Sequence, residues 1–202
     1  MSSEELQAIL LAERRGAYAR LRGGWPIPLA GTVYWAALAL LGEAGLPLAQ
    51  WSMIAFLGTG AIFPLALLFA TIFRNPFMKD RSAVTSVLVP AFISMLLFWP
   101  MIVAAVQEGP NLVPLILAIG LSLHWPVIGW SYGRTAIFSG HAIIRAVGAL
   151  LLWMYFPEER LTLLPLWVAG VYLATVVVIL FDSAMLRRRM SGYSAASAEG
   201  VI

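Results

Sequence analysis

The chain has 202 residues, of which 61% are hydrophobic and 11% are charged, and its mean hydropathy is +0.86. Soluble domains use roughly 45–50% apolar residues, so this composition argues against a water-soluble domain and predicts a single-domain integral membrane protein. The formal charge is +3, but the basic residues lie between hydrophobic runs and do not form a basic face, which argues against nucleic-acid binding. The chain contains no cysteine, which excludes disulfides and thiolate metal sites.

Residues 1–24 are predicted to form a cytoplasmic amphipathic helix along the membrane surface. Ser2 and Glu5 have the spacing of a capping box at a helix start. Apolar residues then recur near helical spacing in SSEELQAILLAERRGAYARLR, with most charges elsewhere. The segment lacks the apolar region of a cleavable signal peptide. A frayed, solvated lead-in is the alternative interpretation.

Six apolar runs follow, each long enough for a helix to cross about 30 Å of hydrocarbon. Backbone groups in lipid must be hydrogen-bonded within their own segment, so at these lengths we expect helices. The sequence therefore predicts an all-α bundle of six transmembrane helices within residues 25–186. The predicted spans are approximately 25–43, 49–73, 84–106, 112–131, 135–156 and 162–182.

The basic residues alternate between the two sides of this bundle. All of the 13 Lys and Arg residues except Arg145 and Arg160 lie in the N-terminal segment or after the second, fourth and sixth spans. The other connections carry four glutamates. The positive-inside rule then predicts that both termini are cytoplasmic. Residues 187–202 begin with three arginines and continue with small polar residues, which predicts a basic, flexible cytoplasmic tail.

Two stretches carry a resemblance to a known family. The run GTGAIFPLALLFATIFRNPF and the later HWP followed by W and YGR, together with the tryptophan-containing first span, resemble a family of small bacterial six-helix membrane proteins. That family is a domain of unknown function, and the likeness covers about residues 25–156. It implies a multi-pass protein of the bacterial inner (plasma) membrane, and it implies no activity, substrate or catalytic residue.

Both histidines of the chain and one intramembrane arginine lie in the fourth and fifth predicted spans. His124 and His141 are at similar distances on either side of the connection SYGR, so both are expected roughly 10 Å inside the membrane. Arg145 follows His141 by four residues and therefore shares its helix face. These three residues are predicted to form a polar cluster, with Arg134 as a further cation in the connection.

An ionised arginine near the bilayer centre costs at least about 2.5–3.5 kcal/mol, so Arg145 should face protein or water. No carboxylate is expected at its depth, because Glu43 and Asp182 belong near span ends. Backbone carbonyls freed by Pro126 or Pro100, a bound anion, or water could neutralise it.

The leading functional hypothesis is a small transporter or channel-like protein that binds a ligand at His124, His141, Arg145 and Arg134. We expect the lipid bilayer and a small anion or carboxylate solute as partners, no nucleic acid, and a chain able to form a homo-oligomer. A structural or assembly subunit without a ligand is the first alternative, because polar residues also join helices within membranes.

A b-type haem with His124 and His141 as axial ligands is the second alternative. Gly120, Gly129 and Gly140 would make room for the porphyrin, and Arg134 or Arg145 would pair with its propionates. No other cofactor or metal is expected. The sequence leans against an enzyme, since it contains no third histidine for a zinc site and no acid placed to orient a serine–histidine pair.

Overall fold

The computed structural model describes residues 1–76, 80, 82 and 86–199, and within these ranges every regular element is helical. Six stretches are long and apolar enough to cross a membrane: Arg22–Glu43, Leu48–Ile72, Leu88–Glu108, Pro110–Ser131, Thr135–Tyr155 and Arg160–Gly192. For the described part of the chain, the prediction of an all-α fold with six long apolar helices is confirmed. Lys79, Arg81 and positions 84–85, where the third span was predicted to begin, lie outside the described residues.

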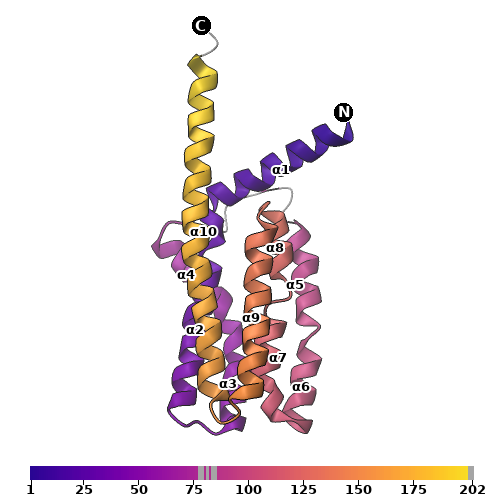
Figure 1. Ribbon diagram of the computed structural model, residues 1–202, viewed down its shortest axis with the longest axis vertical. Coiled ribbons are helices and arrows are strands. Elements are labelled where there is room, and N and C mark those ends of the chain that lie inside the picture. Colours follow the sequence, from indigo (N-terminus) through magenta and orange to yellow (C-terminus); the bar gives the residue numbers. More distant parts are fainter. Residues whose placement is uncertain (77–79, 81, 83–85, 200–202) are drawn as a thin grey trace.

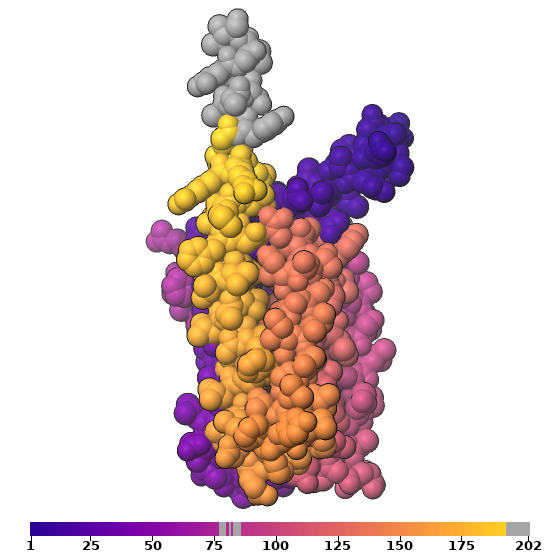
Figure 2. Space-filling model, viewed as in Figure 1, coloured from indigo at the N-terminus to yellow at the C-terminus, as the bar shows by residue number. Residues whose placement is uncertain are grey.

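Helix α1 (Ser3–Arg20) stands off one end of the bundle (Figures 1 and 2). Its predicted capping box is present: the Glu5 amide donates to Ser2 Oγ at 3.1 Å, and the Ser2 amide donates to the Glu5 carboxylate at 2.7 Å. The short helix η1 (Arg22–Gly24) then turns the chain into the bundle. Gly24 has a φ of 67°, a left-handed conformation that favours glycine, and a Cβ there would press on the Tyr132 hydroxyl.

Charged side chains hold α1 against the end of the bundle. The Arg14 guanidinium donates to the carbonyl of Trp130 and lies 4.3 Å from the centre of its ring. At the other end of α1, Arg20 Nε lies 2.8 Å from Asp80 Oδ1, in the segment between the second and third spans. The hydrogen bond with Asp80 raises the pKa of Arg20 above its ordinary value, so the Arg20 guanidinium stays charged.

Three of the six spans are continuous helices and three are interrupted. The continuous helices are α2 (Pro26–Glu43), α9 (Thr135–Tyr155) and α10 (Arg160–Glu199). The second span consists of α3 (Leu48–Gly58), η2 (Thr59–Ala61) and α4 (Ile62–Ile72), and the third of α5 (Leu88–Leu96) and α6 (Trp99–Glu108). The fourth consists of η4 (Pro110–Leu112), α7 (Val113–Gly120) and α8 (Trp125–Ser131).

Proline accounts for two of these interruptions. Pro100 occupies the first turn of α6, and Pro126 occupies the first turn of α8. A proline has no amide hydrogen to continue the hydrogen bonds of the preceding helix, but it is tolerated where a new helix starts. The spans therefore break just before these two positions.

Helix α10 continues to Glu199, past position 182, where the sixth predicted span ends (Figure 1). The structure thus places positions 187–199, which the sequence analysis assigned to a flexible tail, in a helix. Arginine, methionine and alanine are good helix formers, and no proline interrupts this segment. Positions 200–202 of the predicted tail lie outside the described residues.

The bundle is organised around α10, which packs against α2 on one side and α9 on the other. Helix α9 contacts α7 and α8, and α2 also contacts α4. Glycines permit the closest approaches: a Cβ on Gly31 would overlap the ring of Tyr172, and one on Gly42 would overlap the backbone of Leu161. Helices in membranes gain little from burying apolar surface, because lipid is also apolar. Small residues such as these glycines let the helix backbones approach closely and gain van der Waals contacts instead.

The two ends of the bundle differ in charge. Helix α1, the end of α8 and the extension of α10 lie at one end, and the connections after α2, α6 and α9 lie at the other (Figure 1). The first end carries the arginines of α1, of the connection after α8 and of the extension. Basic segments that alternate along the sequence thus gather at one end of the molecule.

The substitution Gly42→Ala should lower the free energy of unfolding by about 1–3 kcal/mol, because the new methyl group would push the start of α10 away from α2. Gly170→Ala is the matched control, since a Cβ at Gly170 meets no atom and alanine has the higher helix propensity. Thermal unfolding of the purified protein, followed by tryptophan fluorescence, measures both. Equal melting temperatures for the two variants would contradict this packing.

Candidate functional site

Arg145 of α9 lies at the centre of the bundle with an exposed fraction of 0%. Its guanidinium carbon is 4.9 Å from the ring centre of Tyr172 on α10 and 5.4 Å from that of Trp35 on α2. No ion pair among the described residues involves Arg145. Aromatic faces attract cations, so these two rings partly take the place of a carboxylate.

The guanidinium has few hydrogen-bond acceptors. Its Nη1 donates to the Tyr172 hydroxyl at 2.7 Å and to the carbonyl of Leu121 at 3.5 Å. The Leu121 carbonyl is available because the fourth span is interrupted between α7 and α8, directly before Pro126. This is the kind of acceptor that the sequence analysis considered for Arg145. The Nε and Nη2 atoms of Arg145 are buried and have no hydrogen-bond partner among the described residues.

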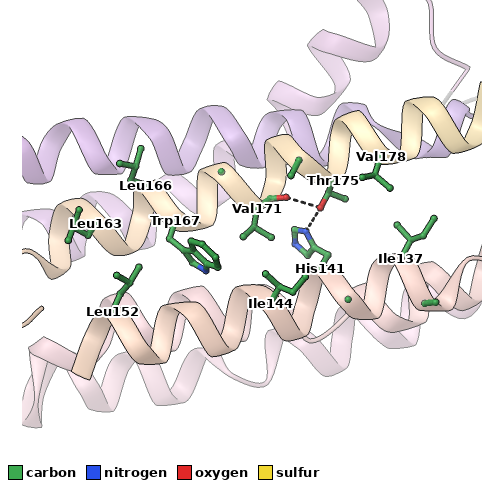
Figure 3. A pocket seen from close by; sticks show the side chains of 14 residues that line it. Ile137, His141, Ile144, Leu152, Leu163, Leu166, Trp167, Val171, Thr175 and Val178 are labelled. Carbon is green, nitrogen blue, oxygen red and sulfur yellow. Dashed lines mark hydrogen bonds between the residues drawn. The ribbon is translucent and has the colours of Figure 1, made fainter. Parts of the chain in front are cut away.

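His141, one turn before Arg145 on α9, has a defined hydrogen-bond role. Its Nδ1 lies 2.8 Å from Thr175 Oγ1 (Figure 3). The Thr175 hydroxyl already donates to the carbonyl of Val171 at 2.8 Å, so its oxygen accepts from His141. The imidazole proton is therefore on Nδ1, and the lone pair is on Nε2. That Nε2 is buried and has no partner among the described residues.

His124 directly precedes α8, makes no capping hydrogen bond with its side chain, and has an exposed fraction of 8%. Its ring centre lies 5.2 Å from that of Phe92 on α5 and 5.7 Å from that of Trp125. The Trp125 indole also lies 4.2 Å from the imidazole of His141. Trp125 thus contacts both imidazoles, while the ring contacts of the described residues include none between the two histidines.

The two histidines line different cavities. His141 lies at the floor of a groove of about 770 Å³ between α9 and α10 (Figure 3). His124 lines a cavity of about 460 Å³ whose wall also includes Trp125 and Tyr172. The first groove is hollow at Gly140, where a Cβ would meet no atom. The cluster therefore lies between two spaces large enough for a small-molecule ligand.

Of the glycines proposed to make room for a porphyrin, Gly140 borders open space. Gly120 and Gly129 instead pack against the side chains of Phe98 and Phe138. Within the described part of the chain, no group of three or more His, Asp or Glu side chains could hold a metal ion. The haem hypothesis depends on ligation by the two histidines and stays a prediction.

A family model, described as "Family of unknown function (DUF7010)", matches residues 10–182. The chain belongs to DUF7010. The match confirms the predicted resemblance to a family of unknown function and extends beyond both ends of the range 25–156. Neither the comparison with curated proteins nor that with solved structures gives a match. Membership of DUF7010 therefore names the family and assigns no activity.

The structure does not bring Arg134 into the cluster of this DUF7010 chain. Its Nε lies 2.6 Å from Asp182 Oδ2, and its guanidinium lies 5.3 Å from the ring centre of Tyr18. Arg134 precedes Arg145 by about 16 Å along α9, at 1.5 Å per residue.

Tyr18, beside this ion pair, keeps its proton. Burial is the main cause that raises the pKa of its hydroxyl, and the nearby Asp182 carboxylate is the second. The protonated hydroxyl donates to the carbonyl of Ile179 on α10.

Sequence reasoning missed the residues that surround the cluster: Trp35, Trp125, Tyr172 and Thr175. Aromatic residues are frequent in membrane helices, so Trp35 and Trp125 carried no specific signal. Tyr172 and Thr175 did carry one, because both place a hydroxyl in the middle of the otherwise apolar sixth run. Polar atoms at that depth need partners, and Arg145 and His141, polar residues of the preceding helix, are their natural candidates.

Arg145→Met should leave the melting temperature unchanged or raise it. The substitution removes a buried cation that lacks partners for two of its nitrogens, and replacing buried charges by apolar side chains of similar size is often neutral or stabilising. Tyr34→Phe is the comparison, because it removes a hydrogen bond of 2.6 Å to the Ala55 carbonyl and should cost about 1 kcal/mol. A larger loss for Arg145→Met than for Tyr34→Phe would show that Arg145 mainly joins helices together.

Proposed function

We propose that the chain is a multi-pass protein of the bacterial inner (plasma) membrane, with both termini in the cytoplasm. Six stretches of suitable length and hydropathy support the membrane assignment. The arginines gathered at the end that holds α1 and the α10 extension support the orientation, because cytoplasmic segments carry an excess of Lys and Arg. The bacterial origin rests on the family resemblance alone.

Within this frame, we infer that the protein is a small transporter or channel-like protein for a small anion or carboxylate. The observation that carries the inference is Arg145, which is fully buried and has, among the residues that the structure describes, no carboxylate partner and no acceptor for Nε and Nη2. The indole Nε1 atoms of Trp35 and Trp125 are also buried and unpartnered. Buried donors without acceptors are costly, and an anion supplies the acceptors that they lack.

The interrupted spans favour transport over a purely structural role. Irregular backbone at membrane depth is tolerated where it is buried in protein or lines a cavity, and transporters build their sites from discontinuous helices. In this chain the break between α7 and α8 contains Leu121 and His124, which both line the cavity that Tyr172, the hydrogen-bond partner of Arg145, also lines. In a ligand-free assembly subunit, Nε and Nη2 of Arg145 would keep the cost of burial without gaining an acceptor from a ligand.

The orientation can be tested with fusions. A fluorescent reporter that matures only in the cytoplasm should be active when fused after Ile202 and inactive when fused after Gly109, because an odd number of spans precedes the second site. A reporter that is active only in the periplasm should give the reverse pattern. Periplasmic activity at position 202 would contradict the proposed topology.

The ligand site can be tested with small anions and purified protein. We expect at least one of chloride, nitrate, sulfate or acetate to raise the melting temperature, since ligand at 100 times its Kd stabilises by about 2.7 kcal/mol. Arg145→Gln should abolish this shift and the uptake of the same anion into proteoliposomes. Arg160→Gln is the matched control, because Arg160 also donates to a carbonyl and lies over a tryptophan, Trp153. An unchanged response in Arg145→Gln would refute the site.

A further inference from the structure

The cavity of about 460 Å³ has a mostly apolar lining with one polar wall, and the hydroxyl-bearing residues Thr59 and Tyr132 also line it. Side chains of α4 lie on one side and side chains of α5 on another, among them Phe63, Ala66, Phe92 and Leu96. The polar wall is formed chiefly by His124, Trp125 and Tyr172. A space of this shape matches a molecule with an apolar body and one polar end.

The polar wall offers hydrogen-bond donors. The Tyr172 hydroxyl accepts a hydrogen bond from Arg145 at 2.7 Å, which leaves its own hydrogen available. Donation from a cation polarises that hydroxyl and strengthens it as a donor. Trp125 Nε1 is buried and has no partner within the described part of the chain. His124 Nδ1 is also buried and unpartnered, and it can accept or donate according to its tautomer.

The cavity reaches the surface between α4 and α5. Phe63 of α4 and Leu96 of α5 both line it, yet their exposed fractions are 51% and 48%. In a bundle within a bilayer, these half-exposed side chains meet acyl chains, so a molecule dissolved in the membrane can enter between them.

We propose that this cavity binds a lipophilic carboxylate, whose alkyl body lies between α4 and α5 and whose carboxylate accepts a hydrogen bond from Tyr172. Arg145, directly behind Tyr172, supplies the balancing positive charge. The proposal rests on the proposed function and narrows its ligand from small anions in general to acids with an apolar body. A small hydrophilic anion leaves the apolar sides of the cavity unfilled, so an acid with an apolar body should bind more tightly than a small anion.

The test uses the full chain in lipid nanodiscs, with empty nanodiscs subtracted, and labelled n-alkanoates as probes. Decanoate should bind with about one molecule per chain, and hexanoate more weakly, because each buried methylene changes affinity about fourfold. Acetate should not bind measurably at the same concentrations. Decanol, which has the same chain length without the charge, should bind at least tenfold more weakly than decanoate.

Two pairs of variants identify the site. Tyr172→Phe should weaken decanoate binding at least tenfold, whereas Tyr34→Phe should not, because the Tyr34 hydroxyl donates to Ala55 and does not line the cavity. Leu96→Trp should narrow the mouth and also weaken binding, and its partly exposed position tolerates the larger ring. Leu97→Trp is its control, with an exposed fraction of 71% and no place in the lining.

The outcomes separate this proposal from the proposed function. If small anions act through Arg145 but decanoate does not bind, the lipophilic ligand is wrong and the anion site stands. If decanoate binds equally to wild type, Tyr172→Phe and Leu96→Trp, it only partitions into the bilayer and the proposal is overturned. If neither class of anion responds to Arg145→Gln, both proposals fail.

Discussion

The packing at the centre of this bundle depends on one buried guanidinium, that of Arg145. Arg145 is inaccessible from any side, and its charge is met by two ring faces, one hydroxyl and one carbonyl in place of a carboxylate. Those groups come from α2, α10 and the break between α7 and α8. Together with α9, which carries Arg145, four segments must therefore meet at one point. A cation in so apolar an environment is tolerated only if the surrounding helices hold these groups firmly in place.

Continuous and interrupted spans have different places relative to the Arg145 contacts. The continuous helices α2, α9 and α10 carry Trp35, Arg145 and Tyr172, and α10 packs against both α2 and α9. The interrupted spans supply most of the lining of the cavity beside Tyr172. Regular helices thus hold the charged centre, while segments with broken backbone hydrogen bonding form the space next to it.

Trp125 contacts both histidines that the sequence predicted to lie in one cluster. Its indole lies against both imidazoles, and His124 and His141 open to different cavities. His141 is further constrained by Thr175, which sets its tautomer and directs the Nε2 lone pair elsewhere. The two histidines therefore have distinct environments, and a ligand in the cavity beside Tyr172 meets His124.

The sequence by itself determined the spans, the alternation of charge, the capping box at Ser2 and the absence of an acid near Arg145. Each of these depends on local properties: the length of an apolar run, the spacing of residues within one helix, or the position of charges relative to span ends. Even the shared face of His141 and Arg145 needs only the helical repeat. These features require no knowledge of how the helices pack.

Only the tertiary structure decided which side chains from different helices meet. The contacts of Arg145 with Tyr172 and Trp35, the pairing of Arg134 with Asp182, and the close approach at Gly42 depend on the rotation of each helix about its axis. A shift of one residue rotates a side chain by about 100°, which is enough to turn it from the core to the surface. Hydropathy is nearly uniform around these helices, so the sequence contains little information about that rotation, and packing decides it.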